Sequence, residues 1–216
     1  MRVIWWIAGN ETKIRKRRVL VFSYGSPSSG IPTTWAAEPD LSGVNLLPDL
    51  SMEAVENIRE LVNSYKEAGD LAVFSVHWGG NWGYDVAEEQ REFAQQLIEK
   101  AGIDLIFGHS SHHPLGMEVY KNKLIIYGAG DFINDYEGIS GHEKYRGELS
   151  LMYFPELDPA TGDLLKLEMV PMEIKKLSLH SASKKDAEWL HKVLDRESRK
   201  FGLEIGLKNG VLEADL

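Results

Sequence analysis

Two short apolar runs that end at histidines constrain the fold of this chain more than any other feature of its sequence. The first is Leu71–Val76, followed by His77, and the second is Ile103–Phe107, followed by Gly108 and His109. Short apolar runs of this kind are typical of buried strands. Parallel neighbouring strands end at the same edge of a sheet, and in open α/β sheets ligands bind at that edge. The sequence therefore predicts a ligand site at the two histidines.

The segment between the two runs predicts a helix over Asp85–Ala101. Asp85 can cap this helix, and Glu88, three residues on, completes a capping box. Apolar residues form one stripe along the segment, and Gly102 ends it. A strand, a helix and a second strand in so short a span indicate a βαβ unit, which has a parallel pair of strands and a right-handed crossover.

The rest of the chain adds antiparallel pairs to this unit, so we expect an α/β fold, an α+β sandwich with mixed pairing. A length of 216 residues is enough for one domain with a sizeable core. We expect residues 1–175 to form the main domain and 176–216 to complete it as a helix and a hairpin. The other expected elements are strands at 3–8 and 19–24, a long loop at 25–48, a helix at 51–68, a hairpin at 117–120 and 124–127, an antiparallel pair at 148–154 and 164–174, a helix at 183–201, and a hairpin at 203–207 and 211–213.

Composition excludes several classes of function. A net charge of −9 argues against a broad nucleic-acid surface, and we interpret the one basic run, Lys13–Arg18, as a solvated turn or strand edge. The chain has no cysteine, which removes disulfides and thiolate zinc sites. No stretch is long enough to span a bilayer, and no signal sequence is recognisable. These features leave the cellular compartment open.

The histidines after the two runs predict a metal site. Imidazole binds divalent metals in its neutral form, which dominates near physiological pH. We expect His77, His109 and His112 to be the ligands, because Gly108 lets the chain turn sharply and the serines between the two later histidines leave room for an ion. His113 is either a further ligand or a general acid, and the alternative is that it packs against a neighbouring tryptophan, Trp78 or Trp82.

A second group of polar and aromatic residues follows the strands at the same edge. Asp131 comes after the run 124–127 and either orients a histidine, binds metal or holds a loop turn. Asp135 is a weaker candidate of the same kind. Asn81 and Asn134 are expected to contact substrate. The aromatic residues of the glycine-rich loop after His77 either line a substrate groove or form the packing core of that loop, and they are Trp78, Trp82 and Tyr84.

At these residues the chain resembles the bacterial capsule biosynthesis protein CapA family, also called poly-γ-glutamate biosynthesis proteins. The order and spacing match over roughly 19–154. The resemblance implies a calcineurin-like metallophosphoesterase fold, a four-layer β-sandwich flanked by helices. The matching pieces are Ser75-Val-His-Trp-Gly79, Gln90-Arg-Glu-Phe-Ala94, Ala101-Gly-Ile-Asp-Leu-Ile-Phe-Gly-His109, His112, Glu118-Val-Tyr120 and Ile126-Tyr-Gly-Ala-Gly-Asp-Phe132.

The chain departs from the family pattern in three places. Asp131-Phe132 stands where the family usually has Asn-Phe, Gly108-His-Ser-Ser-His112 replaces Gly-His-His-Pro-His, and the loop Asn81–Tyr84 differs from the commoner acidic version. The family also resembles phosphoesterases whose Asp and Asn-His motifs supply further metal ligands, and neither motif is present before Ser75. We therefore expect the chain to lack the N-terminal part of the family's domain.

The resemblance implies a role in making capsular poly-γ-glutamate or a related anionic exopolymer. One hypothesis is a metal-dependent hydrolase that uses one or two ions of manganese, zinc or iron on a phosphoester or an amide-linked polymer. In it His113 and Asp131 are catalytic, and Trp78, Asn81, Tyr84 and Asn134 bind substrate. The alternative is a non-catalytic accessory or polymer-binding protein with an incomplete metal site. Expected partners are the anionic polymer or phosphoester, and either a second copy of the chain or a complementing N-terminal segment.

Overall fold

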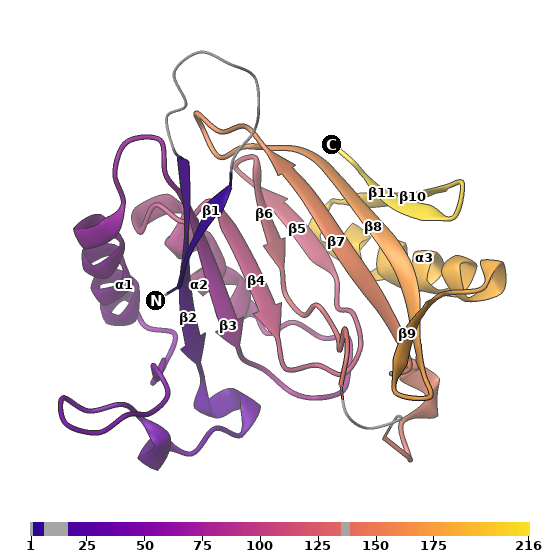
Figure 1. The fold of residues 1–216 in the computed structure, drawn as a ribbon, viewed down its shortest axis with the longest axis horizontal. Coiled ribbons are helices and arrows are strands. Elements are labelled where there is room, and N and C mark those ends of the chain that lie inside the picture. Colours follow the sequence, from indigo (N-terminus) through magenta and orange to yellow (C-terminus); the bar gives the residue numbers. More distant parts are fainter. Residues whose placement is uncertain (1, 7–16, 135–138) are drawn as a thin grey trace.

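The structure is a computed structural model and describes residues 2–6, 17–134 and 139–216 (Figure 1). The basic run Lys13–Arg18 falls mostly outside the described residues, as do Asp135 and the end of the first expected strand. Within the described residues the chain forms two β-sheets and three α-helices. The architecture is α/β with mixed sheets, as the sequence predicted.

The first sheet carries the two histidine-ended strands at its centre. Its strand order is β1-β2-β3-β4-β6-β5, with β2, β3, β4 and β6 parallel to one another and β1 and β5 antiparallel at the two edges. This pairing confirms the predicted parallel βαβ unit. The strands are β1 (Arg2–Trp6), β2 (Arg17–Gly25), β3 (Leu71–His77), β4 (Leu105–His109), β5 (Met117–Tyr120) and β6 (Lys123–Ile126).

The second sheet is antiparallel and comes from the last third of the chain. Its order is β10-β11-β8-β7, and β9 pairs with β8 beside this path. The short polar strand β9 was not expected, because its sequence carries no apolar alternation. The C-terminal hairpin joins the sheet through the pairing of β11 with β8. The strands are β7 (Leu149–Leu157), β8 (Leu164–Lys175), β9 (Ser178–Ser181), β10 (Glu204–Lys208) and β11 (Val211–Asp215).

The helices begin at side-chain caps in two of three cases. Helices α1 (Met52–Tyr65) and α3 (Lys184–Ser198) are capped by Ser51 and Ser183, whose hydroxyls accept from the backbone N–H three residues on. Helix α2 (Glu88–Lys100) begins at Ala87 and not at the predicted Asp85. The Gln90 side chain accepts instead from the Ala87 N–H at 3.4 Å. Short 3₁₀ turns lie at Pro27–Ser29, Thr33–Trp35, Glu143–Tyr145 and Arg199–Phe201.

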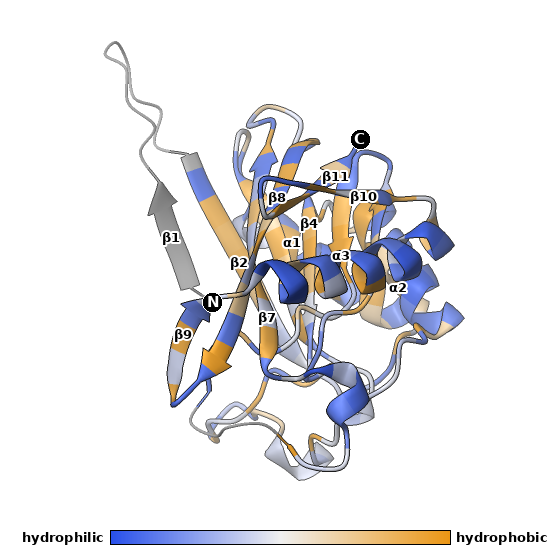
Figure 2. Ribbon diagram, turned by 90° about the vertical axis from the view of Figure 1, so that its right-hand side faces the viewer, coloured by the Kyte–Doolittle hydropathy of each residue, from blue (hydrophilic) through white to orange (hydrophobic). Residues whose placement is uncertain are grey.

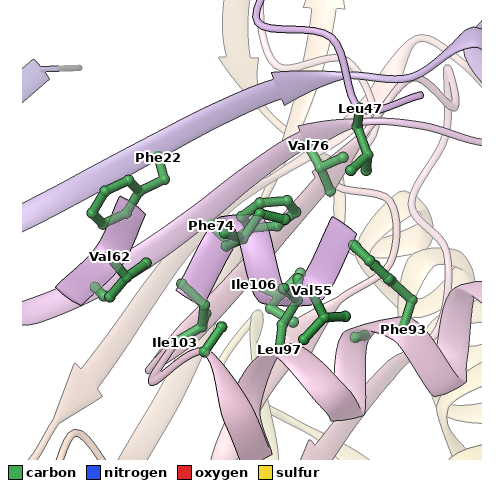
Figure 3. Packing of buried hydrophobic residues seen from close by; sticks show 14 of the residues in the cluster. Phe22, Leu47, Val55, Val62, Phe74, Val76, Phe93, Leu97, Ile103 and Ile106 are labelled. Atoms are coloured by element: carbon green, nitrogen blue, oxygen red, sulfur yellow. The ribbon is translucent and has the colours of Figure 1, made fainter. Parts of the chain in front are cut away.

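Two hydrophobic cores hold these layers together. In the first, α1 and α2 pack on one face of the first sheet, where Phe22, Phe74 and Ile106 meet Val55 and Leu97 (Figure 3). The second core lies between the two sheets and also contacts α3 and the C-terminal hairpin. Figure 2 shows the strands mainly in hydrophobic colours and the helices largely in hydrophilic ones. The second core covers β4 and β6 on their other face, whereas β2 contributes no residue to it and keeps Val19 and Val21 only half-buried.

A close contact inside the first sheet fixes the end of β4. A Cβ atom on Gly108 would lie 2.3 Å from the Tyr127 carbonyl oxygen and 2.6 Å from the Trp78 Nε1 atom. The Trp78 indole N–H donates to that same carbonyl at 3.0 Å. A glycine is therefore required here by space, although the sequence suggested only a need for a sharp turn.

We expect Gly108→Ala to destabilise the fold by at least about 2 kcal/mol, because backbone and indole must move apart to admit a methyl group. The free energy of unfolding from denaturant titration measures the cost. Gly80→Ala is the matched control, since its Cβ would meet nothing closer than 3.8 Å. Equal costs at the two positions would contradict the proposed packing constraint.

Candidate functional site

Two of the predicted histidines form a contacting pair at the edge of the first sheet. The parallel register places His77 directly opposite His109. Their Nδ1 atoms lie 2.9 Å apart, so one ring donates a hydrogen bond to the other. The Ser75 hydroxyl, two residues before His77 on the same face of β3, lies 3.2 Å from the His109 Nε2 atom. Both nitrogens of His109 thus have a partner within the sheet.

Both imidazoles of this pair are held in the neutral form. Burial, with a smaller contribution from the neighbouring His77, lowers the pKa of His109 to about 4. Burial is also the main cause that lowers the pKa of His77, and His112 adds to it. Neutral imidazole is the form that coordinates metals, so the electrostatics of the pair favour a ligand role.

The third predicted ligand is paired with a carboxylate. The His112 Nδ1 atom lies 3.0 Å from Asp131 Oδ2, and the Asn134 amide donates to the same oxygen at 3.1 Å. The His112 backbone N–H donates to the Asn81 carbonyl at 3.1 Å, which ties the two histidine-bearing loops together. Asp131 thus contacts a histidine, the first of the alternatives that its position in the sequence left open.

His113 lies inside a group of stacked rings that we call the aromatic cluster, made of Trp82, Tyr84, His113, His142 and Tyr145. The His113 ring is fully buried and lies 4.6 Å from the Tyr145 ring at an interplanar angle of 13°. Its Nε2 atom has no partner among the described residues. His113 therefore packs against Trp82, the second of the two readings of its position.

The cluster contains two residues that the sequence did not indicate. His142 stacks on Trp82 with ring centroids 4.2 Å apart, and Tyr145 contacts three of the other rings. Both lie in a polar loop with no periodic pattern, so no local signal marks them. Trp78, by contrast, is 2% exposed and packs against Phe93 in the first core.

The turn that joins the histidines contains a strained residue. Ser110 has a φ of +125°, a conformation that costs a residue other than glycine about 1–3 kcal/mol. Its side chain is buried, and its hydroxyl donates to the Gly79 carbonyl at 3.2 Å. Strained backbone of this kind clusters at functional sites, where the surroundings over-determine it.

The site offers two converging imidazoles, and a complete metal centre is not assembled. Across residues 2–6, 17–134 and 139–216, no group of three or more histidine, aspartate or glutamate side chains is arranged to hold an ion. The Nδ1 atoms of His77 and His109 have the chemistry of metal ligands, and the proton of the hydrogen bond between them would have to move before both could bind an ion. His112 is directed to Asp131. The described residues thus supply a two-imidazole half-site.

Fold and site together define an α/β protein with a histidine site at the carboxyl ends of parallel strands. Residues 10–136 match the model of the family described as bacterial capsule synthesis protein PGA_cap. The chain belongs to this family, which confirms the resemblance that its motifs indicated.

Curated relatives agree with this assignment. The chain is 46% identical, over 191 residues, to a probable polyglutamine synthesis accessory protein of Mycobacterium tuberculosis, a match that covers 88% of this chain and 50% of the relative. It is 29% identical to the PGA biosynthesis protein CapA of Bacillus subtilis over 53% of this chain and 28% of that protein. The chain thus spans about half the length, or less, of these relatives. None of its described helices is long and apolar enough to cross a membrane.

We expect Ser110→Gly to be more stable than Ser110→Ala by about 1 kcal/mol. Both changes remove the hydroxyl, but only glycine relieves the positive φ. Denaturant unfolding of the two variants gives the difference. Asn57, an exposed residue in the interior of α1, is the control, because there the alanine variant should be more stable than the glycine variant by a similar amount. An alanine variant at position 110 that matches or exceeds the glycine variant would contradict the strain.

We expect His113 to make the fold sensitive to acid. Burial lowers the pKa of His113 to about 4, whereas an unfolded histidine titrates near 6.5. The contribution to stability is complete above pH 6.5 and is lost as pH falls towards 4, because the unfolded chain takes up the proton first. His113→Phe should reduce the loss of unfolding free energy over this interval by on the order of 2 kcal/mol. Urea titrations at several pH values measure this, with the exposed His180→Phe as control.

Proposed function

We propose that this chain is an accessory protein in the biosynthesis of a capsular glutamate polymer, and that it acts through the His77–His109 pair. Its place in the capsule synthesis family supports the biological role. The single structural observation that carries the proposal is the 2.9 Å approach of two half-buried, neutral imidazoles at the carboxyl ends of parallel strands, where ligands bind in open α/β sheets. Removing the polar nitrogens of two imidazoles from water costs free energy, and a role in binding a ligand would explain why the fold places them there.

We further propose that the chain has a calcineurin-like metallophosphoesterase fold. Two helices packed on one sheet, whose other face packs on a second sheet, give the succession of layers that such a sandwich requires. In such a fold the histidines lie at one end of the sandwich, at the carboxyl ends of β3 and β4. This placement is what supports the assignment.

His77 and His109 would hold a divalent metal, either manganese, zinc or iron, and His112 lies near enough to affect the charge of His77. When bound, such an ion polarises a bond to be broken and makes water a better nucleophile. Ser75 orients the His109 ring from its other nitrogen, which is the usual role of a second contact to a metal-binding histidine. The remaining ligands would come from water, substrate or another segment of polypeptide.

A metal-dependent hydrolase is the second candidate, and the His112–Asp131 contact favours it. A carboxylate at 3.0 Å from an imidazole nitrogen fixes the orientation of the ring, and an oriented histidine is the usual group for general acid–base catalysis. Asn134 fixes that carboxylate from its other side. The substrate would be a phosphoester or an amide-linked polymer placed between this pair and His77.

Basic and aromatic side chains lie beside the site, where an anionic polymer would contact them. The Arg196 guanidinium lies 5.2 Å from the Tyr84 ring centroid, and the Lys144 ammonium lies 4.7 Å from that of Tyr145. Because the whole chain carries a net charge of −9, a glutamate polymer must be attracted locally. We propose that these cations, with Trp82, form the polymer contact.

The metal proposal predicts that His77→Ala and His109→Ala each lower the affinity for Zn²⁺ or Mn²⁺ by about 10- to 100-fold. Isothermal titration with each metal alone, on metal-free protein, measures the affinity. His180→Ala is the matched control, because His180 is exposed on β9, a strand of the second sheet. Equal affinities in all four proteins would overturn the assignment of the half-site.

The same proteins separate the two candidate functions. Hydrolysis of a chromogenic phosphodiester that depends on added metal and is lost in His109→Ala would establish the hydrolase. Metal binding without turnover, combined with binding of poly-γ-glutamate that weakens as salt is raised, would establish the accessory role.

A further inference from the structure

The turn that follows β2 lies at the same edge of the first sheet as the histidine pair. Gly25, the last residue of β2, is the register partner of His77. In Figure 1 the arrowheads of β2, β3 and β4 all point to the lower edge of the sheet, where this turn begins. We call Ser26–Ser29 the serine turn. Ser26 is 4% exposed and Ser28 is exposed, so the turn places one buried and one exposed hydroxyl beside the end of β3.

The serine turn is bonded to the main chain of β3 and of the loop after it. The His77 carbonyl accepts from the Ser26 N–H at 2.8 Å. The Ser29 hydroxyl shares its proton between this carbonyl, at 3.0 Å, and that of Ser26, at 2.7 Å. Two residues after His77, the Gly79 N–H donates to the Ser28 hydroxyl oxygen at 3.0 Å. The turn therefore has a fixed position relative to the strand end that carries His77.

The hydrogen bonds within the turn direct the proton of Ser28 outwards. The hydroxyl oxygens of Ser26 and Ser28 lie 3.0 Å apart, so one of them donates to the other. Ser26 is the donor, because it is buried and a buried polar group is almost always hydrogen-bonded. The Ser28 oxygen then accepts two bonds, from Ser26 and from Gly79, which use both of its lone pairs. The proton of Ser28 consequently faces solvent.

This hydroxyl lies within reach of a ligand bound at the histidine pair. It is bonded to the residue two positions after His77, and two residues of extended chain span about 7 Å. The Ser110 hydroxyl, from the turn after β4, donates to the Gly79 carbonyl at 3.2 Å. The Gly79 segment is thus held from the β2 side and from the β4 side, so the Ser28 hydroxyl is oriented before a ligand arrives.

We propose that Ser28 is a ligand-contacting residue of the histidine site and that its hydroxyl donates to an anionic oxygen of the bound molecule. A proton that faces outwards needs an acceptor, and phosphate and carboxylate oxygens accept the strongest hydrogen bonds. A donor that is oriented in advance needs no reorganisation on binding. This inference rests on the proposed function, which supplies two sources of such an oxygen, a phosphoester and the carboxylates of a glutamate polymer.

The test is the affinity of the Zn²⁺-loaded 216-residue chain for inorganic phosphate and, separately, for a γ-linked glutamate dipeptide, each measured by isothermal titration. Ser28→Ala should weaken one or both by about tenfold, because a hydrogen bond to a charged group is lost. Ser28→Thr keeps the hydroxyl and should bind like the unchanged chain. A loss for phosphate alone identifies a phosphoester as the source of the oxygen, and a loss for the dipeptide alone identifies the polymer.

Ser64→Ala is the matched control, because Ser64 is an exposed serine whose hydroxyl donates within α1, to the Leu61 carbonyl at 2.7 Å. Circular dichroism checks that each variant folds, and Ser28→Gly replaces Ser28→Ala if that variant does not. The affinity for Zn²⁺ is measured first in every protein and should be the same in all of them.

The outcomes separate this inference from the proposed function. A chain that binds no Zn²⁺ contradicts the proposed function, and the inference with it. Normal Zn²⁺ binding, combined with oxyanion affinities that are equal in Ser28→Ala and the unchanged chain, overturns the inference alone. So does an unchanged chain that binds neither oxyanion, a loss that Ser28→Thr does not restore, or an equal loss in Ser64→Ala.

Discussion

The parallel pairing of β3 with β4 is the constraint on which the rest of the structure depends. It places His77 opposite His109, and it extends the same register through β2 and β6, so that every row of side chains crosses the sheet. Because side chains alternate between faces, a slip of one residue in either strand would move its histidine to the helix side and separate the pair. Gly108 protects this register, since only a residue without Cβ lets Trp78 reach the Tyr127 carbonyl across β4.

The sequence predicts this part of the fold because its signals are local. Apolar runs with glycine and histidine at their ends, and a helix of the right length between them, are enough to specify a βαβ unit and to place two histidines together. The sequence predicted a cap at Asp85, because aspartate is a common capping residue and alanine is not. The helix is capped at Ala87 instead, where the backbone N–H donates to the Gln90 side chain. Strand β9 forms only because β8 offers an edge to it.

The sequence also predicted which residues lie near the site, but it did not predict the contacts that they make. Spacing along the chain brought His112 to the site, but the choice between a metal and Asp131 is decided by a loop that folds back from β6. His113 is adjacent in sequence and faces a different environment, where His142 and Tyr145 arrive from a segment about 30 residues later. Contacts of this range leave no periodic trace, so sequence reasoning could name the alternatives for His113 but could not choose between them.

The histidine pair and the half-buried apolar side chains of β3 and β4 lie on the same face of the first sheet. The two imidazoles are half-buried, and so are Val73 and Phe107, which precede them on the same face of the sheet. Excluding water there strengthens every charge interaction of a bound ion, because the local dielectric falls. The more completely water is excluded from this end of the sheet, the more strongly the histidine pair would hold an ion.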